Sequence, residues 1–225
     1  LLLVFSAQLL ALVVGVVLGV ISAQRPNGML SHFVTLLALF GYSAPVFWTG
    51  IMLLIGLSLM LPLFPVAGMV DARLMDAPMW RQYLDVLHHL LLPALTLASI
   101  FLALYSRLCR ASMLEVLGAD YIRTARAKGL TEREIVYKHA LKNSLGPVVT
   151  LAGLQFSAVV SGAVLVETVF SWPGLGTLAL QSILARDTPT ILGILFFSAL
   201  VVIVGNLLTD LVLRLIDPRI RSGGG

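Results

Sequence analysis

Long apolar runs constrain this chain more than any other feature of its sequence. Five stretches carry few or no charges and are long enough, or nearly so, for a helix to cross the ~30 Å hydrocarbon core of a bilayer: 1–22, 33–61, 90–106, 147–166 and 190–213. Because 59% of the 225 residues are hydrophobic and only 12% are charged, the composition excludes a disordered chain and an ordinary soluble domain. The sequence therefore predicts an all-α integral membrane protein, one membrane domain over residues 1–225 with about five transmembrane helices.

The basic residues are distributed very unequally between the predicted loops. One set of alternate loops, together with the tail, holds most of the 15 Lys and Arg residues: Arg25, Arg107, Arg110, Arg123, Arg126, Lys128, Arg133, Lys138, Lys142, Arg214, Arg219 and Arg221. The other set holds only Arg73, Arg81 and Arg186. By the positive-inside rule, the long loop at about 111–146 and the C-terminus are cytoplasmic.

Five spans with a cytoplasmic C-terminus put Leu1 on the outer side. The chain begins inside an apolar run, without an initiator Met or the charged region of a signal peptide. We therefore expect an N-terminal part with at least one further span, so that the full chain has six.

The 111–146 loop has the signals of two short helices. Gly118 ends the helix that leaves the third span, and Asp120 is a plausible N-cap for a helix over 121–128. Gly129 supplies the left-handed residue that closes this helix. Thr131 and Glu134 have capping-box spacing and start the next helix, which Gly146-Pro147 should end.

The role of such a basic surface helix can be interpreted in two ways. It can rest on anionic lipid headgroups. Alternatively, two capped helices joined at one glycine present a defined shape to a protein partner. The small residues Ala125, Ala127 and Gly129 would let that partner's backbone approach closely, and we favour this second reading.

Polar residues within the fourth span are candidates for the lining of a pathway, because polar groups are costly in a bilayer and tend to face a partner helix or a pore. The candidates are Gln155, Ser157, Ser161 and Glu167. Gly153 and Gly162 favour the alternative, close packing against another helix.

Four passages and the C-terminal end resemble one family over nearly the whole chain. The loop YIRTARAKGLTEREIVYKHALKNSLGPVVT at 121–150 is similar to the cytoplasmic "EAA" loop of ABC-importer permeases, in the B-type permease of the dipeptide/oligopeptide/nickel branch. GYSAPVFWTG at 41–50, HHLLLPALTLA at 88–98, VETVFSWPGLG at 166–176 and LIDPRIR at 215–221 point the same way. Arg123-Thr124-Ala125 stands where many importers have Glu-Ala-Ala, and His139-Ala140-Leu141-Lys142 where they have Ile-x-Leu-Pro, so no contact of that glutamate carries over.

The resemblance implies a type I ABC-importer permease fold in which the loop couples transport to ATP hydrolysis. A groove of a cytoplasmic ATPase subunit would receive Tyr121, Arg123, Thr124, Ala125, Arg126, Ala127, Lys128, Gly129 and Leu130. The implied partners are a second homologous permease, two ATPase subunits that use ATP and Mg, and an extracytoplasmic substrate-binding protein. By the same resemblance, Trp172, Pro173 and Gly174 face that binding protein, and the permease binds no cofactor directly.

The function implied is the import of di- or oligopeptides, with nickel chelates or glutathione-like molecules as alternative cargo. An intramembrane enzyme is the rival class, but the sequence contains neither H-E-x-x-H nor G-x-S-x-G. An ion channel would need a filter loop or a charged pore helix, neither of which we recognise. His88 and His89 are adjacent and cannot share a helix face, which argues against a metal site.

Overall fold

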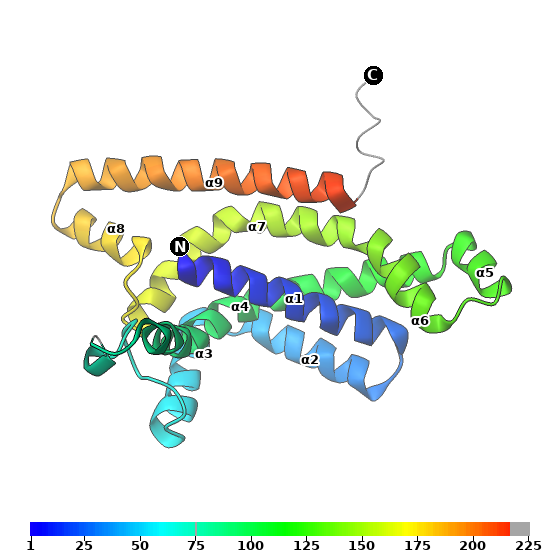
Figure 1. The fold of residues 1–225 in the computed structure, drawn as a ribbon, viewed down its shortest axis with the longest axis horizontal. Helices are drawn as coiled ribbons and strands as arrows, with labels where there is room; N and C mark the ends of the chain where they lie inside the picture. The colour runs from blue at the N-terminus through cyan, green and yellow to red at the C-terminus, as the bar shows by residue number, and fades with distance from the viewer. Residues whose placement is uncertain (75, 217–225) are drawn as a thin grey trace.

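The computed structural model describes residues 1–74 and 76–216. For residues 156–162 and 216 it describes the backbone alone. The described part consists of helices and connecting turns (Figure 1). Its elements in chain order are α1 (Leu2–Gln24), α2 (Met29–Ser43), α3 (Val46–Leu54), the π-helical η1 (Ile55–Met60), the short η2 (Ala72–Leu74), α4 (Met79–Leu117), α5 (Asp120–Ala127), α6 (Glu132–Glu134), the π-helical η3 (Ile135–Ala140), α7 (Leu141–Val169), α8 (Leu175–Leu184) and α9 (Thr188–Ile216).

Three helices among the described residues are long and apolar enough to cross a membrane. They are α1 with 23 residues, α4 with 39, and the first 28 residues of α9. A bent pair, α2 with α3–η1, makes a fourth candidate if it is counted as one span. The span expected at 147–166 falls within α7, which includes the side chains that lie outside the described residues.

The span predicted over 33–61 is wrong as a single continuous helix. The chain bends by 108° between α2 and the helix that follows. Ala44 adopts an extended conformation, with ψ 133°, directly before Pro45. The proline ring disfavours helical backbone at the preceding residue, so the break falls where the sequence places it.

Two other prolines do not end their helices. Pro93 lies inside α4, and Pro147 lies inside α7. The predicted stop at Gly146-Pro147 is therefore wrong: α6, η3 and α7 follow one another without a break from Glu132 to Val169. Ser144 and Val148, on either side of the proline, are fully buried, and packing of this kind compensates for the lost backbone hydrogen bond in membrane helices.

The pairing of α1 with α4 organises the core. Gly15 and Gly19 lie four residues apart on α1, and a Cβ at these positions would stand 2.8 Å from Cβ of Tyr105 and 2.6 Å from Cβ of Cys109, respectively. These glycines allow the two backbones to approach closely, as small residues four apart do in membrane helices. In Figure 1, α7 lies along this pair and α9 lies along α7, while α5 and α6 project from one end of the molecule and α8 lies at the other.

Candidate functional site

The loop that carries α5 begins where α4 ends at Leu117. The amide of Gly118 donates to the carbonyls of Leu114 and Glu115, both at 3.2 Å, and closes α4 as predicted. The predicted N-cap at Asp120 is displaced by one residue. Ala119 is the extended N-cap, and Asp120 is the first residue of α5, where its negative charge favours the helix N-terminus.

A Schellman motif ends α5. Gly129 has φ +81°, its amide donates to the carbonyl of Arg126 at 2.9 Å, and the amide of Leu130 donates to the carbonyl of Ala125 at 3.3 Å. This confirms the predicted left-handed glycine, because only glycine adopts such a φ without cost. Within the described part, no atom lies within 4 Å of a Cβ built on Gly129, so backbone conformation alone demands glycine here.

The predicted capping box follows at once. The amide of Glu134 donates to Oγ1 of Thr131 at 3.3 Å, and the amide of Thr131 donates to Oε2 of Glu134 at 3.0 Å. The Thr131 hydroxyl also donates to that carboxylate at 2.7 Å. These hydrogen bonds, the hydroxyl first, hold the pKa of Glu134 below its usual value.

An exposed ion pair links α5 and α6 across the turn. Nε of Arg126 lies 2.7 Å from Oε1 of Glu132, and one terminal nitrogen lies 3.3 Å from Oε2, so the guanidinium meets the carboxylate with two hydrogen bonds. This contact lowers the pKa of Glu132 and raises that of Arg126. Both side chains are open to solvent, so the pair fixes geometry more than it adds stability.

α5 is anchored to the rest of the molecule on one face. Ile122 is fully buried. The Tyr121 hydroxyl accepts a hydrogen bond of 2.9 Å from Nδ2 of Asn143 in α7. The remaining contacts of α5 are mainly with η3, where Ile135 is also fully buried.

The structure brings the nine predicted coupling residues together on this projecting loop (Figure 1). Ala125 and Leu130 are half-buried, and the other seven are exposed: Tyr121, Arg123, Thr124, Arg126, Ala127, Lys128 and Gly129. Two of its three cations have a carboxylate partner: Arg126 lies 2.7 Å from Glu132 and Arg123 lies 3.5 Å from Asp120. In the described part of the chain, Lys128 has no carboxylate within 4.0 Å. The charges of Arg123, Arg126 and Lys128 therefore exceed those of Asp120 and Glu132 by one.

The structure separates the candidate pathway residues. Glu167 is 4% exposed and accepts a hydrogen bond of 2.8 Å from the amide of Thr177, at the start of α8. A Cβ on Gly174 would overlap the same carboxylate, so Glu167 fixes the turn into α8. Gln155 is half-buried, about 18 Å away along α7 at 1.5 Å per residue. The side chains of Ser157 and Ser161 lie outside the described residues.

The candidate contact with a binding protein lies in the turn between α7 and α8. Trp172 is only 3% exposed, so its ring packs inside the chain. Pro173 is exposed and Gly174 half-buried. The surface of this turn is therefore formed by its neighbours and its backbone, not by the tryptophan ring.

Sequence reasoning missed Gln8, a polar residue inside the first apolar run. Its amide nitrogen donates to the Tyr105 hydroxyl in α4 and, at 3.0 Å, to the carbonyl of Ala152 in α7. One side chain thus joins three helices at the centre of the molecule. A polar contact of Gln8 with neighbouring helices was predictable from the sequence, because an isolated glutamine in an apolar span needs polar partners.

The two adjacent histidines have local partners. Nδ1 of His89 lies 3.2 Å from Oδ1 of Asp85, and Nε2 of His88 lies 2.8 Å from the carbonyl oxygen of Leu63. Within residues 1–74 and 76–216, no three His, Cys, Asp or Glu side chains are grouped as metal ligands would be.

Helices of membrane-spanning length, with a projecting loop of fixed geometry at one end, define a membrane component. The chain matches the family described as "Binding-protein-dependent transport system inner membrane component" over residues 15–222. It is 42% identical over 231 residues to the dipeptide transport system permease protein DppB of Escherichia coli K12, covering 96% of this chain and 68% of that relative. It is 41% identical over 220 residues to the oligopeptide transport system permease protein AppB of Bacillus subtilis 168, covering 98% and 68%.

A solved structure shares the fold. An inward-facing MetNI methionine ABC transporter aligns with a TM-score of 0.71 at 17% identity, covering 96% of this chain and 91% of the matched chain. The chain therefore belongs to the family of binding-protein-dependent transport system inner membrane components, and it has the all-helical fold of an ABC-importer permease.

Proposed function

We propose that this chain is the permease subunit of an ATP-driven, binding-protein-dependent importer of di- or oligopeptides, acting as a single transmembrane domain over residues 1–225. The relatives above 40% identity are named for dipeptide and oligopeptide transport, which supports peptide cargo. In this proposal the permease performs no catalysis. Partner subunits hydrolyse ATP with Mg.

The observation that carries the coupling role is the locked geometry of the α5–α6 turn. A Schellman motif, a capping box and an ion pair fix the direction of both helices. A rigid projection can transmit a displacement of a docked subunit, whereas a loose loop would absorb it. We assign the nine residues from Tyr121 to Leu130, without Ile122, to contact with a cytoplasmic ATPase subunit.

The route of that displacement follows from the anchoring of α5. Its contacts with other elements are mainly with η3, and its side-chain hydrogen bond reaches Asn143 in α7. α7 extends over 29 residues, about 43 Å, and ends at Val169, two residues after Glu167 and just before the turn into α8. We therefore propose α7 as the lever that links the ATPase side to the outer end, with Gln155, Ser157, Ser161 and Glu167 as its candidate pathway residues.

The remaining partners follow from the orientation that we propose. With α5 and the C-terminus on the cytoplasmic side of a bacterial or archaeal membrane, the α7–α8 turn faces outward, and Trp172, Pro173 and Gly174 mark the contact with a substrate-binding protein. The exposed apolar side chains of α9, among them Leu192, Phe196 and Ile203, are available to lipid or to the second permease. The second permease and two ATPase subunits complete the transporter.

Reconstitution tests this proposal and its alternative cargo. The assembled transporter in proteoliposomes, with its binding protein and internal ATP, should accumulate a labelled dipeptide and lose uptake when ATP is omitted. Competition with glutathione and with a nickel–histidine chelate ranks the alternatives. Uptake of the nickel chelate or glutathione without uptake of any peptide would overturn the peptide assignment. Failure to co-purify with an ATPase subunit would overturn the permease role.

A further inference from the structure

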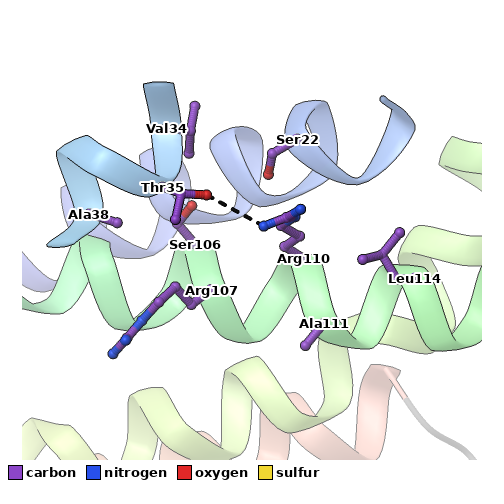
Figure 2. A pocket seen from close by; sticks show the side chains of 9 residues that line it. All are labelled: Ser22, Val34, Thr35, Ala38, Ser106, Arg107, Arg110, Ala111 and Leu114. Atoms are coloured by element: carbon purple, nitrogen blue, oxygen red, sulfur yellow. Dashed lines mark hydrogen bonds between the residues drawn. The ribbon is translucent and has the colours of Figure 1, made fainter. Parts of the chain in front are cut away.

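A cavity of about 400 Å³ lies between α1, α2 and α4, and residues of these three helices line it (Figure 2). Its walls combine the apolar side chains of Val34, Ala38 and Leu114 with the cations Arg107 and Arg110. The hydroxyl residues Ser22, Thr35 and Ser106 also line it. Two guanidinium groups at one cavity are unusual in a membrane domain, because a charge there is costly unless it meets an anion.

Arg110 has hydrogen bonds but no countercharge. One terminal nitrogen donates to the carbonyl of Pro26 at 3.1 Å and the other to Oγ1 of Thr35 at 3.4 Å. Its Nε is buried and has no hydrogen-bond partner among residues 1–74 and 76–216. Among the described residues, no carboxylate lies within 4.0 Å of this guanidinium. These neutral oxygens accept hydrogen bonds from two of its nitrogens, but they do not compensate its positive charge.

Arg107 adds a second cation one turn earlier on α4. Its guanidinium carbon lies 5.3 Å from the ring centroid of Tyr42, and it too lacks a carboxylate partner in the described part of the chain. Residues three apart share one face of a helix. In Figure 2, Arg110 points toward α1 and α2, whereas the exposed Arg107 points away from Arg110. It is therefore the more accessible of the two.

The depth of the cavity matches the headgroup region. Arg110 bonds the carbonyl of Pro26, which lies in the turn between α1 and α2, and this turn lies at the same end of the molecule as α5 (Figure 1). On the orientation proposed above, that end is cytoplasmic. The cytoplasmic leaflet carries anionic lipid, whose attraction for surface Lys and Arg is about 1 kcal/mol each.

We propose that this cavity binds a phosphate group at Arg110, with Arg107 adding positive charge to its lining, and that the apolar walls accommodate what the phosphate carries. A guanidinium fork matches phosphate oxygens in geometry and charge, and in the described part of the chain Arg110 has no carboxylate within 4.0 Å that would compete for it. An anionic phospholipid headgroup and free inorganic phosphate share this chemistry. The site rests on the proposed orientation only for its leaflet.

The test uses the assembled transporter purified in detergent and examined by native mass spectrometry. Palmitoyl-oleoyl phosphatidylglycerol is titrated in, with palmitoyl-oleoyl phosphatidylcholine and inorganic phosphate as separate arms. Variants are Arg110→Gln and Arg110→Lys. The matched control is Arg73→Gln, which removes an exposed arginine of η2 at the other end of the molecule.

Arg110→Gln should weaken phosphatidylglycerol retention by about tenfold, the factor that corresponds to ~1.4 kcal/mol, and Arg73→Gln should leave it unchanged. Arg110→Lys keeps the charge without the fork and should fall between. Displacement of the lipid by inorganic phosphate supports the site and identifies the free ion as its ligand; failure of phosphate to compete identifies the lipid. Equal retention by wild type, Arg110→Gln and Arg110→Lys, with no phosphate effect, would overturn the proposal. Lipid retention is measured without transport. Its result can therefore be interpreted even if the peptide-import assignment fails.

Discussion

Nε of Arg126 in α5 donates a 2.7 Å hydrogen bond to Oε1 of Glu132 in α6, across the turn that Gly129 makes. The two residues belong to different helices and are six positions apart, so their contact fixes the angle between those helices. Together with the Schellman motif and the capping box, it makes this projecting loop a defined shape.

Gly129→Val should uncouple ATP hydrolysis from transport while leaving membrane insertion intact. A β-branched residue at φ +81° meets the steric penalty of left-handed backbone, about 1–2 kcal/mol, and would change the turn. We expect stimulation of ATPase activity by the substrate-loaded binding protein to fall about tenfold. Gly129→Asn is the matched control, because asparagine tolerates this conformation. Wild-type stimulation in the valine variant would show that the turn does not couple.

Acidification should loosen the α5–α6 turn. Arg126 lowers the pKa of Glu132, and Thr131 lowers that of Glu134. A carboxylate with a lowered pKa contributes stability above its unfolded value of about 4.3, and this contribution is lost as the pH falls through the folded value. A spin label at Lys128 should therefore become more mobile below the ordinary glutamate range.

Each glutamate accounts for part of that pH response. Glu132→Gln alone should reduce the dependence of label mobility on pH, and Glu132→Gln with Glu134→Gln should remove it. An unchanged response in the double variant would mean that other groups order the turn.

How much of this site follows from sequence depends on the range of the interaction. The left-handed Gly129 and the capping box at Thr131 were predictable, because each is set by residues within four positions. The α5–α7 hydrogen bond joins residues 22 positions apart, and local signals carry no information about it. The cavity at Arg110 could not be predicted from local signals either, because residues of three helices line it. In the sequence alone, Arg110 is one of many basic residues in the loops.

The errors in the helix boundaries have a common cause. Pro45 breaks its helix, whereas Pro93 and Pro147 lie inside theirs. A proline always removes one backbone donor, but surrounding packing decides whether the helix continues. The Gly15–Gly19 spacing did carry a long-range signal, since small residues four apart mark close helix pairs, and it went unused in our reading of the sequence.

Tyr121→Phe and Asn143→Ala should each reduce the peptide transported per ATP by about fivefold. Either change removes the 2.9 Å hydrogen bond between α5 and α7, a loss of ~1 kcal/mol. Asn143→Ala also removes the 3.0 Å hydrogen bond from Nδ2 to the carbonyl of His139. The double variant should therefore be no worse than Asn143→Ala alone. Tyr137→Phe is the control, since this exposed hydroxyl of η3 has no hydrogen-bond partner in the described part of the chain. Additive losses would contradict the proposed route through α7.

Gly19→Ala should destabilise the transporter by about 1–3 kcal/mol, the usual cost of overpacking. The added Cβ would stand 2.6 Å from Cβ of Cys109 and 2.9 Å from the backbone oxygen of Ser106, and the latter cannot move without shifting α4. Thermal unfolding of the purified complex measures the change. Gly193→Ala is the control, because no described atom lies within 4 Å of its Cβ. Equal unfolding temperatures for both variants would show that α1 and α4 separate more easily than their packing indicates.

Cross-linking from the α5–α6 turn tests the central claim most directly. A photoreactive amino acid at Ala127 or Lys128, both exposed, is activated in the assembled transporter within its membrane, with Leu192 on the exposed apolar face of α9 as the reference position. The account predicts a covalent product with the ATPase subunit from Ala127 and Lys128, and no such product from Leu192. Capture of phospholipid alone at all three positions would contradict it.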